Sequence, residues 1–167
     1  MKTRILSSLF IFGILFSGSS IAQNEIETER HSLVGITQFG ISVEIEKPIG
    51  LQEITLNPAE IQDEISKSFA TLPATLLSFN ELKRSFYNPF FYVHVNIMQA
   101  EDGIYPFSIE MRFYQPIKLS LKNDVESMAS TWHSGYVGMV SFDRTNEIAG
   151  VVLEATKEFK DEFERLN

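Results

Sequence analysis

The chain has 167 residues, and its 22 acidic against 14 basic residues give a formal net charge of −8. This length suits one domain, and the lack of cysteine excludes a disulfide framework, a thiolate nucleophile and Cys-based metal sites. The acidic balance argues against non-specific nucleic-acid binding and against docking on anionic membranes, because both need clustered Lys and Arg.

The N-terminus has the three parts of an export signal. Lys2 and Arg4 precede an apolar run over residues 5–16, and Ser20 and Ala22 occupy the small-residue positions of a cleavage site. As a helix this run would rise about 18 Å, short of the roughly 30 Å hydrocarbon core of a bilayer. We therefore expect cleavage after Ala22, a periplasmic or secreted protein, and no membrane span in the mature chain.

The remaining chain shows no repeat, linker or low-complexity tract. Residues 23–32 are polar and acidic and are expected to form a flexible lead-in. Residues 33–167 then form a single domain.

The first half of that domain predicts a strand and a helix. Apolar residues alternate with polar ones from Phe39 to Ile45, and the opposite phase of the preceding residues suggests a bend or bulge near residues 37–40. Asn57 is a good N-cap, with Pro58 at the first position and Glu60 placed for a capping box, and Pro73 stops the helix. A short strand over residues 76–79 and a helical turn capped by Asn80 follow.

Residues 90–100 and 104–121 read as two long strands, the second interrupted by Pro116. A two-residue loop between them would pair apolar with polar side chains. A three-residue loop with Gly103 in the left-handed conformation instead pairs Val95 with Ile109 and makes every pair on that face apolar. We therefore predict the three-residue loop.

This register fixes the opposite, polar face of the hairpin, which is the candidate binding site. There Tyr92 faces Arg112, His94 faces Glu110, Asn96 faces Ser108, and Tyr114 follows Arg112 on the same side. The alternatives are a solvated face of ordinary cross-strand pairs, and a catalytic pair of His94 with Glu110. Catalysis is disfavoured because Ser108 lies in mid-strand rather than on an elbow turn, and no oxyanion loop is evident.

After a turn at residues 122–124, residues 127–142 predict a third long strand with possible bulges at Gly135 and Gly138. A final helix, capped by Asp143 or Thr145, runs to about Leu166. Its apolar stripe is expected to pack on the sheet, and consists of Ile148, Val151, Val152, Ala155, Phe159, Phe163 and Leu166. The expected fold is α+β, a two-layer sandwich of a mainly antiparallel sheet with two amphipathic helices on one face.

No metal site or cofactor is expected. The three histidines lack metal-ligand spacing, and we expect His133 to pair near residues 114–116, about five residues from His94 along the sheet. Glycine-rich phosphate loops and calcium loops are absent from the sequence. Trp132 could be a sugar-stacking platform, but a core position on the helix-covered face is the ordinary interpretation.

Several short motifs resemble a group of small exported bacterial proteins of unknown function. The matching residues are Leu51, the run 92–96 (YVHVN), the run 101–105 (EDGIY), Thr131-Trp132 with Gly135 and Gly138, and a closing helix with Phe163. The resemblance covers residues 90–167 well and the first half loosely. It implies an exported α+β domain and supplies no activity.

Together these patterns predict a non-enzymatic binding or assembly module of the cell envelope, with an unknown protein or small ligand as partner. The polar sheet face or an exposed strand edge would be its contact surface. Two alternatives stay open: an envelope hydrolase using His94 and Glu110, and a carrier of a hydrophobic ligand held between helices and sheet.

Overall fold

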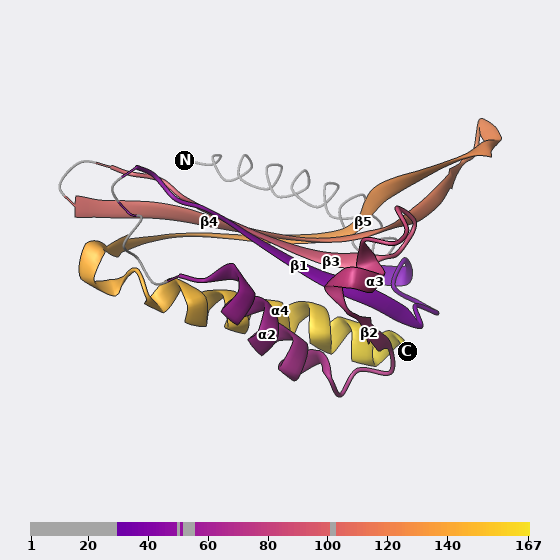
Figure 1. Cartoon of the computed structure of the whole chain (residues 1–167), viewed down its shortest axis with the longest axis horizontal. Coiled ribbons are helices and arrows are strands. Elements are labelled where there is room, and N and C mark those ends of the chain that lie inside the picture. The colour runs from indigo at the N-terminus through magenta and orange to yellow at the C-terminus, as the bar shows by residue number, and fades with distance from the viewer. Residues whose placement is uncertain (1–29, 50, 52–55, 101–102) are drawn as a thin grey trace, which may run out of the picture.

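A computed structural model describes residues 30–49, 51, 56–100 and 103–167, with the backbone alone of residues 122–124 (Figure 1). The predicted signal peptide, residues 1–22, and residues 23–29 of the predicted lead-in lie outside the described residues. No helix in the described part of the chain is long and apolar enough to cross a membrane.

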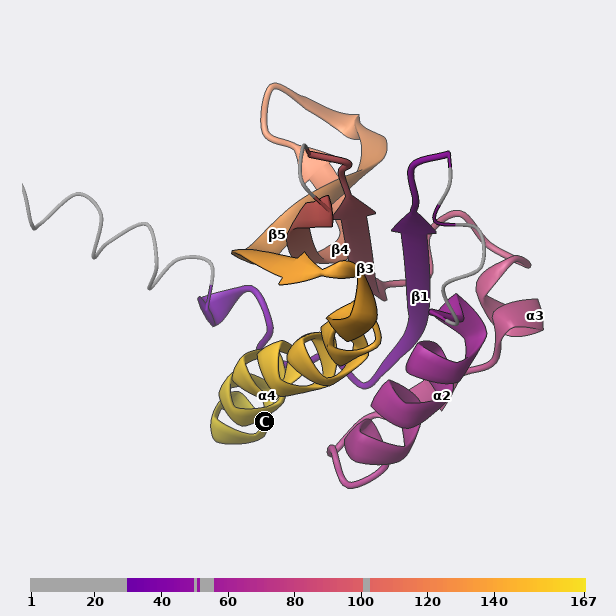
Figure 2. The ribbon, with the colours of Figure 1, turned by 90° about the vertical axis from the view of Figure 1, so that its left-hand side faces the viewer.

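The fold is α+β, as the sequence predicted. Five strands form one sheet in the order β2-β1-β3-β4-β5, and the long helices α2 and α4 lie side by side against one face (Figure 2). The elements are β1 (Gln38–Glu46), α2 (Pro58–Phe69), β2 (Thr75–Leu77), α3 (Phe79–Leu82), β3 (Phe90–Ile97), β4 (Ile104–Leu119), β5 (Lys122–Ser141), a 3-10 turn (Phe142–Arg144) and α4 (Glu147–Leu166).

The order β3-β4-β5 is an antiparallel meander, but β1 pairs in parallel with both β2 and β3. Hydrophobic periodicity did not predict these parallel pairs. They follow from the connections: parallel neighbours need a crossover, and here α2 joins β1 to β2 while α3 lies between β2 and β3.

The short helix α3 packs against the face of the sheet opposite to α2 and α4. The Leu82 side chain lies where a side chain on Gly40 would be, since a Cβ there would come within 2.9 Å of Leu82. Gly40 thus allows α3 to approach β1. The bend or bulge expected near residues 37–40 is absent, because β1 runs regularly from Gln38; the change of phase comes from a turn that ends at Gly35, whose φ is +77°.

The predicted register of the β3–β4 hairpin is confirmed. Val95 pairs with Ile109 and His94 with Glu110, and Gly103 has a φ of +70°. The Ala100 amide donates to the Ile104 carbonyl, which closes the predicted three-residue loop, although residues 101–102 lie outside the described residues. The burial of alternate side chains along β3 matches the predicted apolar face.

The β4–β5 hairpin differs from the prediction in its turn and its bulge. The turn is at residues 120–121 rather than 122–124, and Thr131 is the extra residue opposite the step from Phe113 to Tyr114. Gly135 and Gly138 pair regularly, so the bulges expected there are wrong. Pro116 does not interrupt β4. It lies beyond Tyr114, the last β4 residue that pairs with β3, so this part of β4 pairs with β5 alone. The missing N–H of proline can therefore disturb one set of strand hydrogen bonds at most.

The helix starts were only partly predicted. Asn57 caps α2 by accepting from the Ala59 amide, but Glu60 contacts the Asn57 side chain instead of completing a capping box. Ser78, rather than Asn80, caps α3 and forms a capping box with Glu81. Asn146 precedes α4, one residue beyond the predicted Thr145. These shifts of one or two residues are typical of helix ends read from sequence.

Phe159 of α4 is the centre of the core between helices and sheet. Its ring lies 4.4 Å from that of Phe91, 5.1 Å from Trp132, 5.5 Å from Phe113 and 5.6 Å from Phe69, centroid to centroid. The α4 stripe is therefore a core face, as predicted, except that Val151 is 38 % exposed.

Trp132 is a core residue on the helix-covered face and not a sugar platform. Only 3 % of it is exposed, and its indole N–H donates to Glu162 of α4 at 2.6 Å. The other carboxylate oxygen of Glu162 pairs with Arg30 at 2.6 Å. Ser32 also donates to the Thr131 carbonyl, so the last residues of the expected flexible lead-in, 30–32, are docked on the domain.

Candidate functional site

The sheet face opposite α2 and α4 carries the candidate site, and we call it the open face. It is formed by the polar phase of three neighbouring strands, with α3 at its Gly40 end. Its members are Glu44 and Glu46 from β1, Phe90, Tyr92, His94 and Asn96 from β3, and Ser108, Glu110, Arg112 and Tyr114 from β4.

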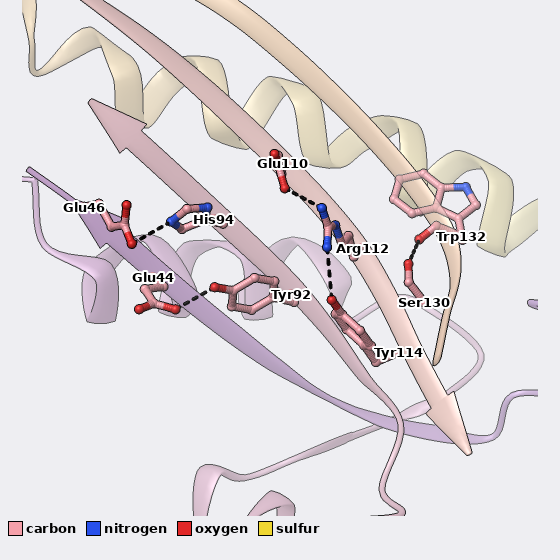
Figure 3. Close-up of polar contacts among 9 residues, drawn as sticks. All are labelled: Glu44, Glu46, Tyr92, His94, Glu110, Arg112, Tyr114, Ser130 and Trp132. Atoms are coloured by element: carbon pink, nitrogen blue, oxygen red, sulfur yellow. Dashed lines mark hydrogen bonds and ion pairs between the residues drawn. The ribbon is translucent and has the colours of Figure 1, made fainter. Parts of the chain in front are cut away.

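Each predicted site residue lies where the hairpin register placed it. Tyr92 is opposite Arg112 and His94 opposite Glu110 (Figure 3). Asn96 is opposite Ser108, and all six residues are half-buried or exposed. Because strands hold successive side chains on opposite faces, the buried partners on the helix side fix these polar side chains on the open side. The structure thus brings all seven predicted residues onto one surface.

Arg112 organises the β4 side of the open face. One guanidinium nitrogen donates to Glu110 at 2.7 Å and the other lies 3.4 Å from the Tyr114 hydroxyl (Figure 3). The side chains of Arg112 and Glu110 remain 44 % and 49 % exposed. Both groups therefore have free surface toward a ligand while their positions are already constrained.

On the β1 side, two carboxylates that the sequence analysis did not select complete the site. Glu44 accepts a hydrogen bond from the Tyr92 hydroxyl at 2.5 Å, and Glu46 lies 3.6 Å from His94 Nε2 (Figure 3). Burial, and then the hydrogen bond to Glu44, raise the pKa of Tyr92 well above its ordinary range. Tyr92 is therefore a neutral donor at any physiological pH.

Aromatic rings lie between the charged side chains of β1 and those of β4. Phe90 and Tyr114 stack across the strands with centroids 5.0 Å apart, and Tyr92 and His94 lie nearly parallel at 6.1 Å. Tyr92 meets Tyr114 edge to face at 6.3 Å. Phe90 was missed as a site residue, although its even position in the alternation of β3 indicated this face.

The catalytic pair of His94 with Glu110 is not formed. Glu110 pairs with Arg112, while the carboxylate beside His94 is that of Glu46. The sequence could not show this, because the β1–β3 neighbourhood depends on a parallel pairing that periodicity does not reveal. A histidine that acts as a general base must be held in place by its partner. Here His94 and Glu110 contact other residues and not each other.

His133 also lies elsewhere than expected. It pairs with Arg112, not with residues 114–116, so it is two residues from His94 along the sheet instead of five. The difference arises from the early turn and the register shifts of the β4–β5 hairpin. Within the described ranges no group of three or more His, Cys, Asp or Glu residues is placed to hold a metal ion.

Comparison with known proteins adds a distant likeness to a solved structure. No family model and no curated protein matches the chain. Among solved structures it is similar to the hypothetical protein CT253 from Chlamydia trachomatis, with 13 % sequence identity and a TM-score of 0.36, over 78 % of this chain and 93 % of that chain.

Proposed function

We propose that this protein is an exported binding or assembly module of the bacterial cell envelope, and that it holds a polar ligand or partner protein on the open face. One observation carries the proposal: aromatic, cationic and anionic side chains gather, partly exposed, on the sheet face that α2 and α4 leave uncovered. A surface that only needed solvation would not require stacked rings between its charges.

The chemistry of the open face suits recognition more than reaction. The stacked pair Phe90–Tyr114 offers a flat apolar surface, Arg112 offers exposed N–H donors, and Glu110 and Glu44 offer acceptors. These groups lie on strands, which hold side chains more rigidly than loops do, so little side-chain order is lost on binding.

The hydrolase alternative is less well supported because its two proposed residues have separate partners. Glu110 binds Arg112, and the carboxylate beside His94 belongs to Glu46, so Glu110 is not the partner of His94 that this alternative requires. Ser108 itself is in the middle of β4, a regular strand that lacks the strained turn of a serine nucleophile.

The carrier alternative needs a cavity between helices and sheet, and aromatic rings occupy that space. Phe39, Phe91 and Phe113 are fully buried against Phe159. A groove of about 150 Å³ does lie between α2 and α4, lined by Leu56, Asn57, Glu60, Ile61, Glu64, Ala149 and Leu153. Its lining includes no residue of the sheet, and it is smaller than the roughly 300 Å³ at which ligand pockets begin.

Export is part of the proposal and is supported by the sequence of residues 1–22. A positively charged start, a short apolar run and a small-residue cleavage site are the features that secretory machinery recognises. Residues of the mature protein would then meet their partner in the periplasm or outside the cell.

A binding comparison with a matched charge reversal tests the proposal. Envelope extract of the source organism would be passed over immobilised wild type, Arg112→Glu and Lys118→Glu. Lys118 is an exposed cation on the same strand beyond the open face, 70 % exposed, so its reversal changes the net charge equally. We expect Arg112→Glu to lose a specific partner that wild type and Lys118→Glu retain; equal retention by all three would refute binding at the open face.

A further inference from the structure

The outer edge of β5 is the longest exposed strand edge of the sheet. β5 runs from Lys122 to Ser141 and pairs with β4 on one side, while no described strand lies on its other side (Figure 2). The opposite edge of the sheet is β2, which has three residues. Unpaired N–H and C=O groups on a long edge are a template for another strand, and proteins usually protect them with charges or proline.

β5 lacks that protection over most of its length. Residues 127–141 contain no Asp, Glu, Lys, Arg or Pro, in a chain whose net charge is −8. Two acidic copies could therefore meet along this strand without like charges at the contact. Glu158 of α4 reaches the same strand, but its Oε2 accepts hydrogen bonds from Ser134 at 2.7 Å and Tyr136 at 2.9 Å of its own chain.

The order of large and small side chains on this edge is self-complementary. Val137 is 88 % exposed and Met139 is 74 % exposed. If two copies of β5 pair in antiparallel fashion about Val137, then Tyr136 of each copy lies opposite Gly138 of the other. Met139 likewise lies opposite Gly135. Tyr136 and Met139 thus each meet a glycine, and the two Val137 side chains meet each other.

Nothing in the fold of a single chain requires a glycine at position 135. A Cβ there would only touch the Ile109 carbonyl oxygen at 3.5 Å, an ordinary contact, and its φ is not in the left-handed region. Gly138 differs, because a Cβ would come within 2.5 Å of the Phe107 ring. Glycine in a strand loses cross-strand packing, and a large side chain opposite it restores that packing.

We propose that the partner of this edge is a second copy of the chain, paired antiparallel through residues 133–141 with a two-fold axis at Val137. One sheet then continues across both copies, and the interface is the same patch on each. The bulge at Thr131, where Ser32 docks, marks the end of the seam. This proposal goes beyond the proposed function and does not depend on the open face binding anything.

The first test measures the molar mass of the purified protein in solution by sedimentation, over a wide range of protein concentration. The protein is used in the form in which the expressing cell releases it, with or without residues 1–22. Wild type should have twice the chain mass. Val137→Lys places two ammonium groups at the axis and should be monomeric, with an unchanged circular dichroism spectrum because Val137 is exposed. Leu121→Lys, a matched control at the 96 % exposed tip of the same hairpin, should remain dimeric.

A cross-link tests the proposed pairing of the two β5 strands, and this test does not depend on whether Val137→Lys folds. The chain has no cysteine, so Val137→Cys introduces a single thiol. Residues directly opposite in antiparallel strands have Cα atoms about 4.5–5.5 Å apart, which is within the disulfide range. Val137→Cys should form a disulfide dimer on mild oxidation, and Leu121→Cys should not. A monomeric wild type, a dimer that survives Val137→Lys, or failure of Val137→Cys to cross-link would each overturn the proposal.

Discussion

Each side chain of the β3–β4 hairpin lies either in the core or on the open face, and successive residues alternate between the two. Val95 is 1 % exposed among apolar side chains, while the adjacent His94 points to the open face beside Glu46. The cost of changing a residue here therefore depends on its phase in the strand more than on its chemistry.

The pair Val95 and His94 makes this difference measurable. Val95→Asp places a carboxylate in the core and should lower the free energy of unfolding by on the order of 4 kcal/mol. His94→Ala should cost less than about 1 kcal/mol, because it removes only half-exposed cross-strand contacts. Urea denaturation of the two variants checks this, and similar midpoints would contradict the register.

Tyr92 makes stability depend on pH in the alkaline range. Burial and the Glu44 hydrogen bond raise the pKa of Tyr92 in the folded protein above its unfolded value near 10. The folded state thus holds the phenol proton more tightly, so this contribution is complete below about pH 10 and is lost as the pH rises through the folded pKa. Denaturation midpoints measured from about pH 8 to 11 should fall more steeply for wild type than for Tyr92→Phe; parallel curves would show that folding does not raise the pKa of Tyr92.

At the scale of elements, α4 holds the helical layer to the sheet through Phe159 and, at the edge, through Glu162. The Phe159 ring contacts rings from four strands and from α2, and Glu162 joins Trp132 to Arg30. A core built on one central ring is sensitive to that ring, because close-packed neighbours cannot fill the space it leaves.

Phe159→Ala should therefore lower the free energy of unfolding by about 3–5 kcal/mol. That is a large share of the roughly 5–15 kcal/mol of a typical domain, so the variant should melt at a far lower temperature. Val151→Ala is the matched control, since Val151 is on the same helix but 38 % exposed. A thermal melt of both variants decides the point, and an unshifted melt for Phe159→Ala would mean that α4 is not a core helix.

Some elements followed from the sequence because a local pattern determined them, and others depended on contacts between distant segments. Alternation fixed the register of the β3–β4 hairpin and thereby seven residues of the open face. It could not show that β1 lies beside β3, and so it missed the Glu46 partner of His94. The bulge at Thr131 was missed because Gln115 and Ser32, from other segments, hold it in place.

For the whole molecule, export would determine where the open face meets its partner. We expect the mature chain to begin at Gln23, because Ser20 and Ala22 suit signal cleavage. N-terminal sequencing or intact mass of the protein from a culture of the source organism checks this. A chain that keeps Met1 in the membrane fraction would contradict it.

The proposed contact surface is the open face and not the helical layer. A photo-reactive amino acid placed at Glu110 or at Glu154 in the exporting cell tests it directly. Both positions carry exposed carboxylates, with 49 % and 72 % of the side chain exposed, but Glu110 is on the open face and Glu154 on α4. Binding at the open face should give a discrete cross-linked product from position 110 and none from position 154; a product from position 154 alone, or the same product from both, would place the contact surface elsewhere.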